Sequence, residues 1–129
     1  RAFEQSGFTV PEAHAKGFLD TLAGMDKAKI SRYLGGRPWD VDLFRVTTDY
    51  QEAAFVQRRK TTLIGRETWV ISPEDLILHK LVAGRRRDLV DVDDILLVSG
   101  QLDVVYLRRW APLLKVSESL EERLREALM

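Results

Sequence analysis

SPEDLILHKLVAGRRRDLVD, residues 72–91, is the stretch that decides the fold, because it carries the clearest helix signals in the chain. Ser72 is a favourable N-cap residue, and Pro73 fits the first position of a helix, where its missing N–H costs nothing. The two acidic residues that follow favour the positive end of the helix dipole. Gly84 suits the position just after a helix end. The stretch therefore predicts a helix between Ser72 and Gly84, followed closely by a second helix.

Helical signals continue to the end of the sequence. Apolar residues at helical spacing follow Asp88 and stop at Gly100, and Asp103 is placed to cap the next segment. Ser119 and Glu122 have the spacing of a capping box for a last helix. The second half of the chain is thus predicted to be a packed helical tail.

Extended segments and tight turns dominate the first half. Residues 27–44 predict two strands joined by a pair of glycines, and residues 61–71 predict a second hairpin. A helix is expected between them, after Asp49. Upstream, residues 8–10 predict a short strand, and the next helix is expected from Pro11 to near residue 24.

These elements together predict an α+β fold. It contains a hairpin-rich sheet flanked by helices and ends in the helical tail, and we expect a single domain over residues 1–129. The start of the sequence resembles the end of a helix, so we expect the domain to be incomplete at its N-terminus.

Composition restricts the classes of function. The 129 residues are 45% hydrophobic and 31% charged, and 20 basic residues balance 20 acidic ones. A chain with no net charge has no global attraction to nucleic acid or to a membrane surface, so any polyanion must be held by a local cluster. Cysteine is absent, which excludes disulfide scaffolds, thiolate zinc sites and cysteine nucleophiles. We expect a cytoplasmic protein that does not enter a membrane.

Two aspartates on a predicted strand are the first candidate site. Asp40 and Asp42 stand in WDVDLF, residues 39–44, so their side chains share one face about 7 Å apart. Paired carboxylates can bind a hard cation such as Mg²⁺. A solvated polar face of an ordinary strand explains the same spacing and is favoured on spacing alone.

A basic cluster between the two predicted helices is the second candidate. Lys80 lies at the border of the apolar face of its helix, where its ammonium group can extend toward a cleft. Arg85, Arg86 and Arg87 are suited to bidentate phosphate recognition. Asp88 and Asp91 have i, i+3 spacing and could orient these arginines. An N-capping aspartate within a solvated run of charges is the alternative, and the sequence leaves both interpretations open.

Taken in order, WDVDLF, the segment from residue 67 to residue 96 and LDVVYLRRW resemble the minimal nucleotidyltransferase-like proteins, which include AbiEii-type toxins. The resemblance covers roughly the whole chain, and SPEDLILHKLVAGRRRDLVD is its most specific part. It implies a mixed sheet flanked by helices, with three metal-binding carboxylates. By this resemblance Asp42 is the third carboxylate, a catalytic metal ligand, and Asp40 is an accessory ligand. The glycine-rich turn and D-x-[DE] motif that supply the other two carboxylates do not precede Asp40.

The resemblance also assigns roles to the basic cluster. Lys80 matches a lysine associated with nucleotide binding, and Arg85 and Arg87 are expected beside it at the nucleotide. Asp88 and Asp91 match the acidic residues of an R-D-x-x-D segment that orders the site. The implied reaction is Mg²⁺-dependent transfer of a nucleotidyl group from a nucleoside triphosphate (NTP) to an acceptor hydroxyl. The sequence does not identify the nucleotide or the acceptor.

Two other functions remain open. The first is a nucleotidyltransferase fold that has lost catalysis and serves as a binding or regulatory module, for example with a protein partner in a toxin–antitoxin pair. The second is nucleic-acid binding through Arg85, Arg86 and Arg87, which the neutral net charge disfavours. An exposed sheet edge would also favour association into a homo-oligomer.

Overall fold

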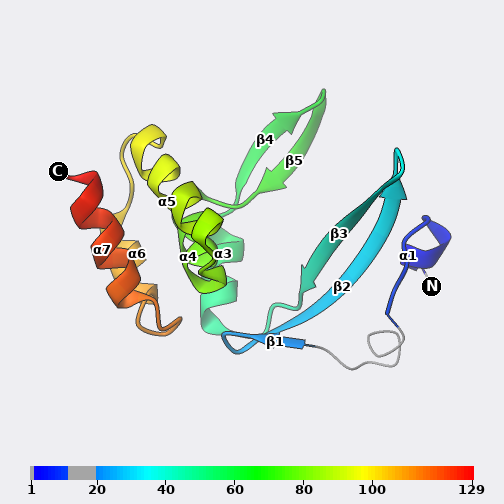
Figure 1. Cartoon of the computed structure of the whole chain (residues 1–129), viewed down its shortest axis with the longest axis horizontal. Coiled ribbons are helices and arrows are strands. Elements are labelled where there is room, and N and C mark those ends of the chain that lie inside the picture. Colours follow the sequence, from blue (N-terminus) through cyan, green and yellow to red (C-terminus); the bar gives the residue numbers. More distant parts are fainter. Residues whose placement is uncertain (1, 12–19) are drawn as a thin grey trace. The chain divides into compact units, whose positions relative to one another are not determined.

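The computed structural model describes residues 2–11 and 20–129. The chain divides into two compact units, residues 1–48 and residues 49–129, and we describe each by itself (Figure 1). None of the helices in the described residues is long and apolar enough to cross a membrane. The prediction of a single domain over the whole chain stays a prediction.

The first unit contains a three-stranded antiparallel sheet. After a short helix, α1 (Ala2–Gln5), the strands β1 (Asp20–Leu22), β2 (Met25–Leu34) and β3 (Arg37–Phe44) pair in the order β1-β2-β3. The long hairpin of β2 and β3 is the one predicted around the glycine pair. The short strand expected at residues 8–10 is represented by a single bridge between Thr9 and Ser31.

The helix expected from Pro11 to near residue 24 is wrong at its C-terminal end. Residues 12–19 lie outside the described residues, but residues 20–22 form β1 and pair with the start of β2. Ala23 and Gly24 both have positive φ angles, 50° and 80°. Two successive residues of this kind make the tight turn that suits the twist of a hairpin, so the chain reverses where helical spacing alone predicted a continuous helix.

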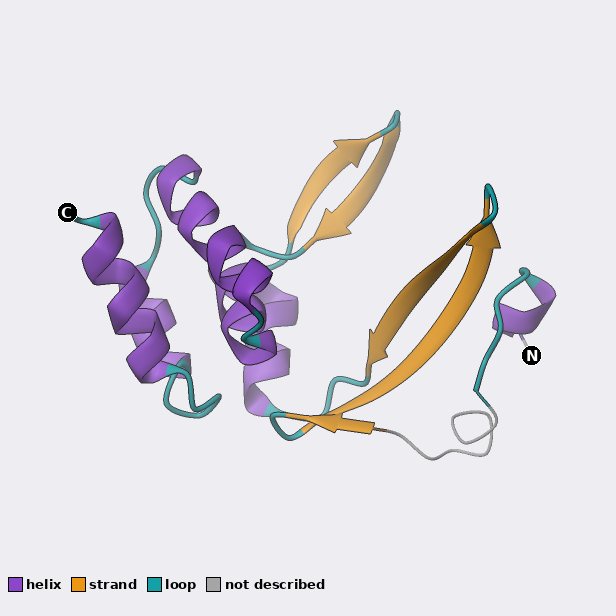
Figure 2. Cartoon of the chain, in the orientation of Figure 1, coloured by secondary structure: helices purple, strands orange, loops and turns teal. Residues whose placement is uncertain are grey.

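The second unit is mostly helical (Figure 2). It begins with α3 (Asp49–Gln57) and a two-stranded antiparallel hairpin, β4 (Arg59–Leu63) and β5 (Arg66–Val70). Four helices follow: α4 (Pro73–Ala83), α5 (Arg86–Val98), α6 (Val104–Trp110) and α7 (Ser117–Ala127). Within this unit, α4 packs against α5 and α6, and α5 packs against α7.

Buried apolar side chains join these helices. They are contributed by α4, α5, α6, the α6–α7 connection and α7, and they include Ile77, Leu78, Leu81, Val92, Leu107, Trp110, Leu114, Leu120 and Leu124. Each fully buried side chain of this size contributes about 1.5–3 kcal/mol. The stability of this unit therefore comes mainly from helix packing, whereas β4 is exposed along its whole length.

The caps of α4 are those that the sequence predicted. The Ser72 hydroxyl accepts a hydrogen bond from the Asp75 N–H. Gly84 follows the helix in the left-handed conformation, with φ of 66°, and its N–H donates to the Lys80 carbonyl. Asp103 likewise caps α6 by accepting from the Tyr106 N–H.

Another predicted cap is wrong, and the N-cap role that the sequence left open for Asp88 is not observed. The last helix starts at Ser117 with Val116 at the N-cap, so Ser119 lies inside its first turn. The chain turns at Lys115, whose φ is 60°, and this turn starts the helix earlier than a serine signal indicates. Asp88 is not the N-cap of α5, because Arg85 occupies that position and Asp88 stands three residues later.

The fold class is α+β, as predicted, with helices beside small sheets and a helical C-terminal part. The mixed sheet that the resemblance implied is not found among the described residues. Their strands form two separate sheets, of three and two strands, and every pair is antiparallel, because each connection between paired strands is a tight hairpin turn.

Candidate functional site

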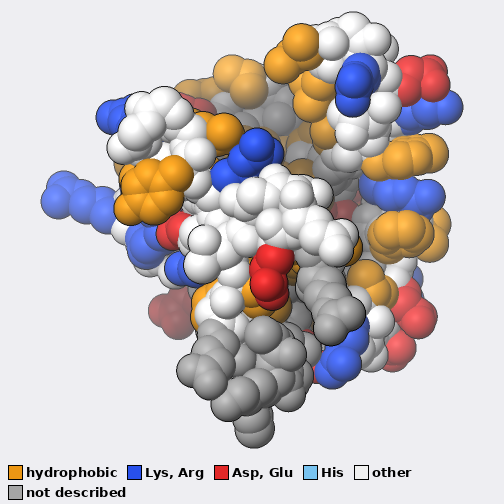
Figure 3. All heavy atoms as spheres, turned by 90° about the vertical axis from the view of Figure 1, so that its right-hand side faces the viewer, with side chains coloured by type: hydrophobic (Ala, Val, Ile, Leu, Met, Phe, Trp, Pro, Cys, Tyr) orange, Lys and Arg blue, Asp and Glu red, His pale blue; other side chains and the backbone are white. Residues whose placement is uncertain are grey.

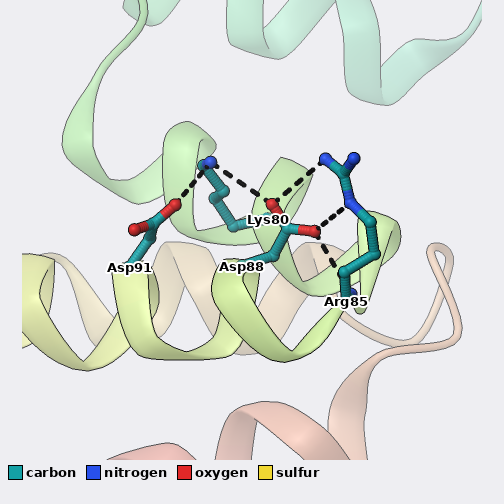
Figure 4. A network of polar contacts seen from close by, with 4 residues as sticks. All are labelled: Lys80, Arg85, Asp88 and Asp91. Carbon is teal, nitrogen blue, oxygen red and sulfur yellow. Dashed lines mark hydrogen bonds and ion pairs between the residues drawn. The ribbon is translucent and has the colours of Figure 1, made fainter.

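Lys80 and two aspartates form a polar network between α4 and α5 (Figure 4). The Lys80 Nζ lies 2.7 Å from Asp91 Oδ2 and 3.3 Å from Asp88 Oδ1. Asp88 and Asp91 are one helical turn apart on α5, so both carboxylates face the same amine from α4. The turn at Gly84 sets the two helices side by side and thereby brings these three residues together.

Asp88 is the centre of this network. Its side chain is 1% exposed, and it accepts hydrogen bonds from Arg85 as well as from Lys80. The Arg85 Nε lies 2.7 Å from Asp88 Oδ2, and the Arg85 backbone N–H donates to the same oxygen over 3.2 Å. The Arg85 hydrogen bond, with a further one from Lys80, lowers the pKa of Asp88 from 3.8 to about 2 against the opposing effect of burial. Asp88 is therefore ionised at neutral pH.

Lys80 is held in its charged form. The hydrogen bond to Asp91 is the main reason that its pKa is raised, and the bond to Asp88 adds to it. The two aspartates hold the ammonium group in place. The Lys80 side chain is 31% exposed, so this charge still reaches the surface. A fixed ammonium group at a surface is suited to binding a phosphate.

The other basic residues of the cluster differ in how they are placed. Arg85 is bound to Asp88 and its side chain is more than half exposed, so it presents part of its guanidinium group next to Lys80 (Figure 4). Arg86 and Arg87 are exposed on the first turn of α5 and make no ion pair within the described residues. The structure thus brings together Lys80, Arg85, Asp88 and Asp91, and it leaves Arg87 at the surface of the same turn.

Asp40 and Asp42 lie on β3 in the first unit, where they face basic and polar residues of β2. The Ser31 hydroxyl donates to Asp40 over 2.6 Å, and Lys29 lies 3.9 Å from the same carboxylate. Lys27 lies 3.8 Å from Asp42. This is a row of cross-strand pairs on one face of a hairpin, which is the solvated strand that the spacing alone favoured.

The carboxylates do not make a complete magnesium site by themselves. Nowhere in residues 2–11 and 20–129 does a group of three or more His, Cys, Asp or Glu residues come close enough to hold a metal ion. Asp40 and Asp42 supply oxygen ligands of the kind that Mg²⁺ takes, but a lysine lies near each of them. A metal would have to displace these lysines and find further ligands.

A second polar cluster in the same unit was not predicted. Asp75 is fully buried and accepts hydrogen bonds from the Tyr50 hydroxyl over 3.0 Å and from the Tyr106 hydroxyl over 2.8 Å. Ser72 donates to the other carboxylate oxygen over 2.8 Å. Burial is the main cause that raises the pKa of both tyrosines, and the neighbouring Asp75 carboxylate raises it further. Their hydroxyls therefore stay protonated and act as donors. The sequence did contain Asp75, in the S-P-E-D motif, but there it was interpreted only as an acidic residue that favours the positive end of the helix dipole.

A small pocket lies beside this cluster. It has a volume of about 210 Å³ and is lined by Gln57, Arg59, Ser72, Glu74, Asp103 and Tyr106. This is smaller than most small-molecule sites, and none of Lys80, Arg85, Asp88 and Asp91 lines it. The cluster around Asp75 joins α3, α4 and α6. The partly exposed polar network of Lys80, Arg85, Asp88 and Asp91 is the better candidate for ligand binding.

Comparison with protein families decides which group this chain belongs to. Residues 19–128 match the family described as nucleotidyltransferase of unknown function (DUF6036). The chain belongs to this nucleotidyltransferase family. Neither the curated proteins nor the solved structures contain a match.

Membership in the nucleotidyltransferase family confirms the resemblance seen in the sequence at the level of the family, while the AbiEii-type relationship stays a prediction. The matched range contains every residue that the sequence nominated for the site, including Asp40, Asp42 and Lys80. The roles of these residues in binding metal or nucleotide remain predictions.

Proposed function

We propose that this chain carries part of the site for nucleotidyl transfer from an NTP to an acceptor hydroxyl, with Lys80 and Arg85 binding the phosphates. One observation supports this role above the others. In this chain, which belongs to a nucleotidyltransferase family, one buried and one half-exposed carboxylate hold the Lys80 ammonium group at the surface. A cation that is fixed before the ligand arrives loses little freedom on binding.

The chemistry of the site follows from its charges. Nucleotidyl transfer leaves pyrophosphate, and negative charge grows on that group as the bond breaks. Lys80 and the exposed part of Arg85 would stabilise this charge, and Arg87 lies on the same turn to contact a more distant phosphate. Asp88 and Asp91 would act as positioning residues, since they hold the two cations through hydrogen bonds.

The proposal includes Mg²⁺ because the family resemblance implies it. The metal would neutralise the triphosphate and activate the attacking oxygen, with Asp42 as a ligand and Asp40 as an accessory. The lysines on β2 lie near both carboxylates, so a metal ion would have to displace them. The experiment measures whether NTP binding depends on the metal.

Binding of a fluorescent ATP analogue, with and without Mg²⁺, tests the proposal. We expect Lys80→Ala to weaken binding at least tenfold, which is the effect of losing one charge-assisted hydrogen bond. Arg125→Ala, on the exposed side of α7, removes a positive charge away from the network and should leave binding unchanged. The proposal fails if no NTP binds in the presence of Mg²⁺ or if both variants bind like the unmodified protein.

A binding or regulatory module without catalysis is the second candidate. It is favoured by the pairing of Asp40 and Asp42 with lysines, which gives both carboxylates a structural role. In that case Asp42→Asn would leave NTP binding and its Mg²⁺ dependence unchanged, and no labelled nucleotide would be transferred to any acceptor. Loss of Mg²⁺-dependent binding in Asp42→Asn would instead support the catalytic proposal.

A further inference from the structure

An aromatic and basic surface lies where α3 meets the β4–β5 hairpin. The Arg58 guanidinium group stacks between two rings, 3.9 Å from the Phe55 ring centre and 4.3 Å from the Trp69 ring centre. The Lys60 ammonium group lies 5.9 Å from the same Trp69 ring. We call Phe55, Arg58, Lys60 and Trp69 the stacked surface.

The strand register explains why these side chains meet. Lys60 and Trp69 are direct partners across the β4–β5 hairpin, so they lie on the same face of it. Arg58 precedes β4 by one residue and reaches this face in step with Lys60. Figure 1 shows the hairpin extending away from the helices of its unit.

The two rings are unusually exposed for their size. Phe55 is 56% exposed and Trp69 is 54% exposed, although large aromatic side chains are normally well buried. Figure 3 shows that basic side chains lie next to exposed hydrophobic ones on the face of the molecule that it presents. Because Arg58 fills the space between the rings, the sides of Phe55 and Trp69 that face away from it are the ones that a flat ligand could stack on.

Charge adds to the stacking. Residues 58–70 contain four basic side chains and one acidic one, Glu67, in a chain whose net charge is zero. Glu67 pairs with Lys60 over 3.1 Å at an exposed position, where an ion pair is weak and easily exchanged for another anion. Arg58 makes no ion pair in the described ranges, and its Nη1 donates to the Phe55 carbonyl. Further N–H groups of Arg58 remain to bind a phosphate.

We propose that the stacked surface binds single-stranded nucleic acid. Unpaired bases would stack on Phe55 and Trp69, and the phosphates between them would contact Arg58 and Lys60. Stacking on aromatic rings next to cations is how proteins bind single strands without reading the sequence. The neutral charge of the whole chain argued against nucleic-acid binding through Arg85, Arg86 and Arg87, but this local cluster lies on a different element and supplies aromatic rings that those arginines lack.

Fluorescence anisotropy with labelled 12-nucleotide strands of oligo(U) and oligo(dT) tests this proposal. No NTP or metal is added, so the result does not depend on the proposed nucleotidyl transfer. We expect Trp69→Ala to weaken binding about tenfold or more, the size of losing one stacked base. Trp69→Phe keeps an aromatic ring and should restore most of the affinity. We expect Arg58→Gln to reduce the slope of log K against log salt by about 0.7, the value for one phosphate contact.

Arg109→Gln is the matched control. Arg109 also lies over a tryptophan, 5.2 Å from the Trp110 ring, but Trp110 is only 8% exposed, against 54% for Trp69. This variant should bind like the unmodified protein. The proposal is overturned if no single strand binds at low salt, if Trp69→Ala binds normally while circular dichroism shows it folded, or if a 12-base-pair duplex binds as tightly as the single strands.

Discussion

At the residue scale, Asp88 joins the two helices that carry the candidate site. Its carboxylate receives Lys80 from α4 and Arg85 from the start of α5, and it is buried between them. We expect Asp88→Asn to lower the free energy of unfolding, because an amide cannot accept all of these hydrogen bonds. The same variant should weaken NTP binding, since Lys80 would lose one of its two carboxylate partners.

The effect of Asp88 should depend on pH in a defined direction. Its folded pKa of about 2 lies below its ordinary 3.8, so its contribution to stability is complete above about pH 4 and is lost as the pH falls toward 2. Urea unfolding at several pH values measures this. The difference in stability between the unmodified protein and Asp88→Asn should shrink as the pH falls through that window. A difference that stays constant from pH 6 to pH 2 would contradict the assignment.

Asp75 gives a second prediction at this scale. Replacement by alanine removes the acceptor of three hydroxyl groups, from Ser72, Tyr50 and Tyr106. We expect Asp75→Ala to destabilise the protein by about 3 kcal/mol or more, because donors are left buried and unpaired. Tyr106→Phe removes one of these bonds with its donor and should cost only about 1 kcal/mol. Equal losses in the two variants would show that the cluster does not act through Asp75.

The two clusters differ in how far the sequence could predict them. Asp88 and Asp91 were expected to orient Arg85, Arg86 and Arg87, because they lie one helical turn apart beside these arginines. Asp88 does bind Arg85, whereas Asp91 binds Lys80 instead. The two tyrosine partners of Asp75 come from 25 and 31 residues away, on α3 and α6. Local spacing carries no information about which tyrosines will meet a given aspartate, so that cluster could only be seen once the helices were packed.

At the element scale, the hairpins are shaped by their two-residue turns. Ala23–Gly24, Gly35–Gly36 and Ile64–Gly65 all have two successive positive φ angles. Glycine adopts this conformation without strain, so the sequence correctly predicted the turns at the glycine pair and at Gly65. The first turn was missed because Ala23 is a good helix former and favoured the extension of a helix through residue 24.

The β4–β5 turn carries strain that a substitution should relieve. Ile64 is fully exposed and has a φ of 49°, a conformation that β-branched residues avoid and asparagine tolerates. We expect Ile64→Asn to stabilise the protein by about 1 kcal/mol, within the penalty for a non-glycine residue in the left-handed region. Ile64→Val keeps the branched side chain and should change little. Thermal unfolding measures both, and a destabilised Ile64→Asn would mean that Ile64 makes a contact the strain argument omits.

At the scale of the whole molecule, the family match and the division into units carry different information. The match runs over residues 19–128 and therefore includes both the strand with Asp40 and Asp42 and the helices with Lys80. The structure divides between residues 48 and 49, so the carboxylates and the cations belong to different compact units. Sequence signals of capping and turn formation predicted most elements, but they act over a few residues and could not show this division.

Residues 49–129 should fold without the first unit. The core of residues 49–129 is built from residues of this second unit, among them Ile77, Leu107 and Leu120, which are fully buried. We expect this fragment to unfold cooperatively and to keep the near-ultraviolet circular dichroism of its buried Trp110. The fragment contains Lys80 and Arg85 and should therefore bind the ATP analogue. A fragment that shows no cooperative transition would indicate that the chain folds as the single domain its sequence predicts.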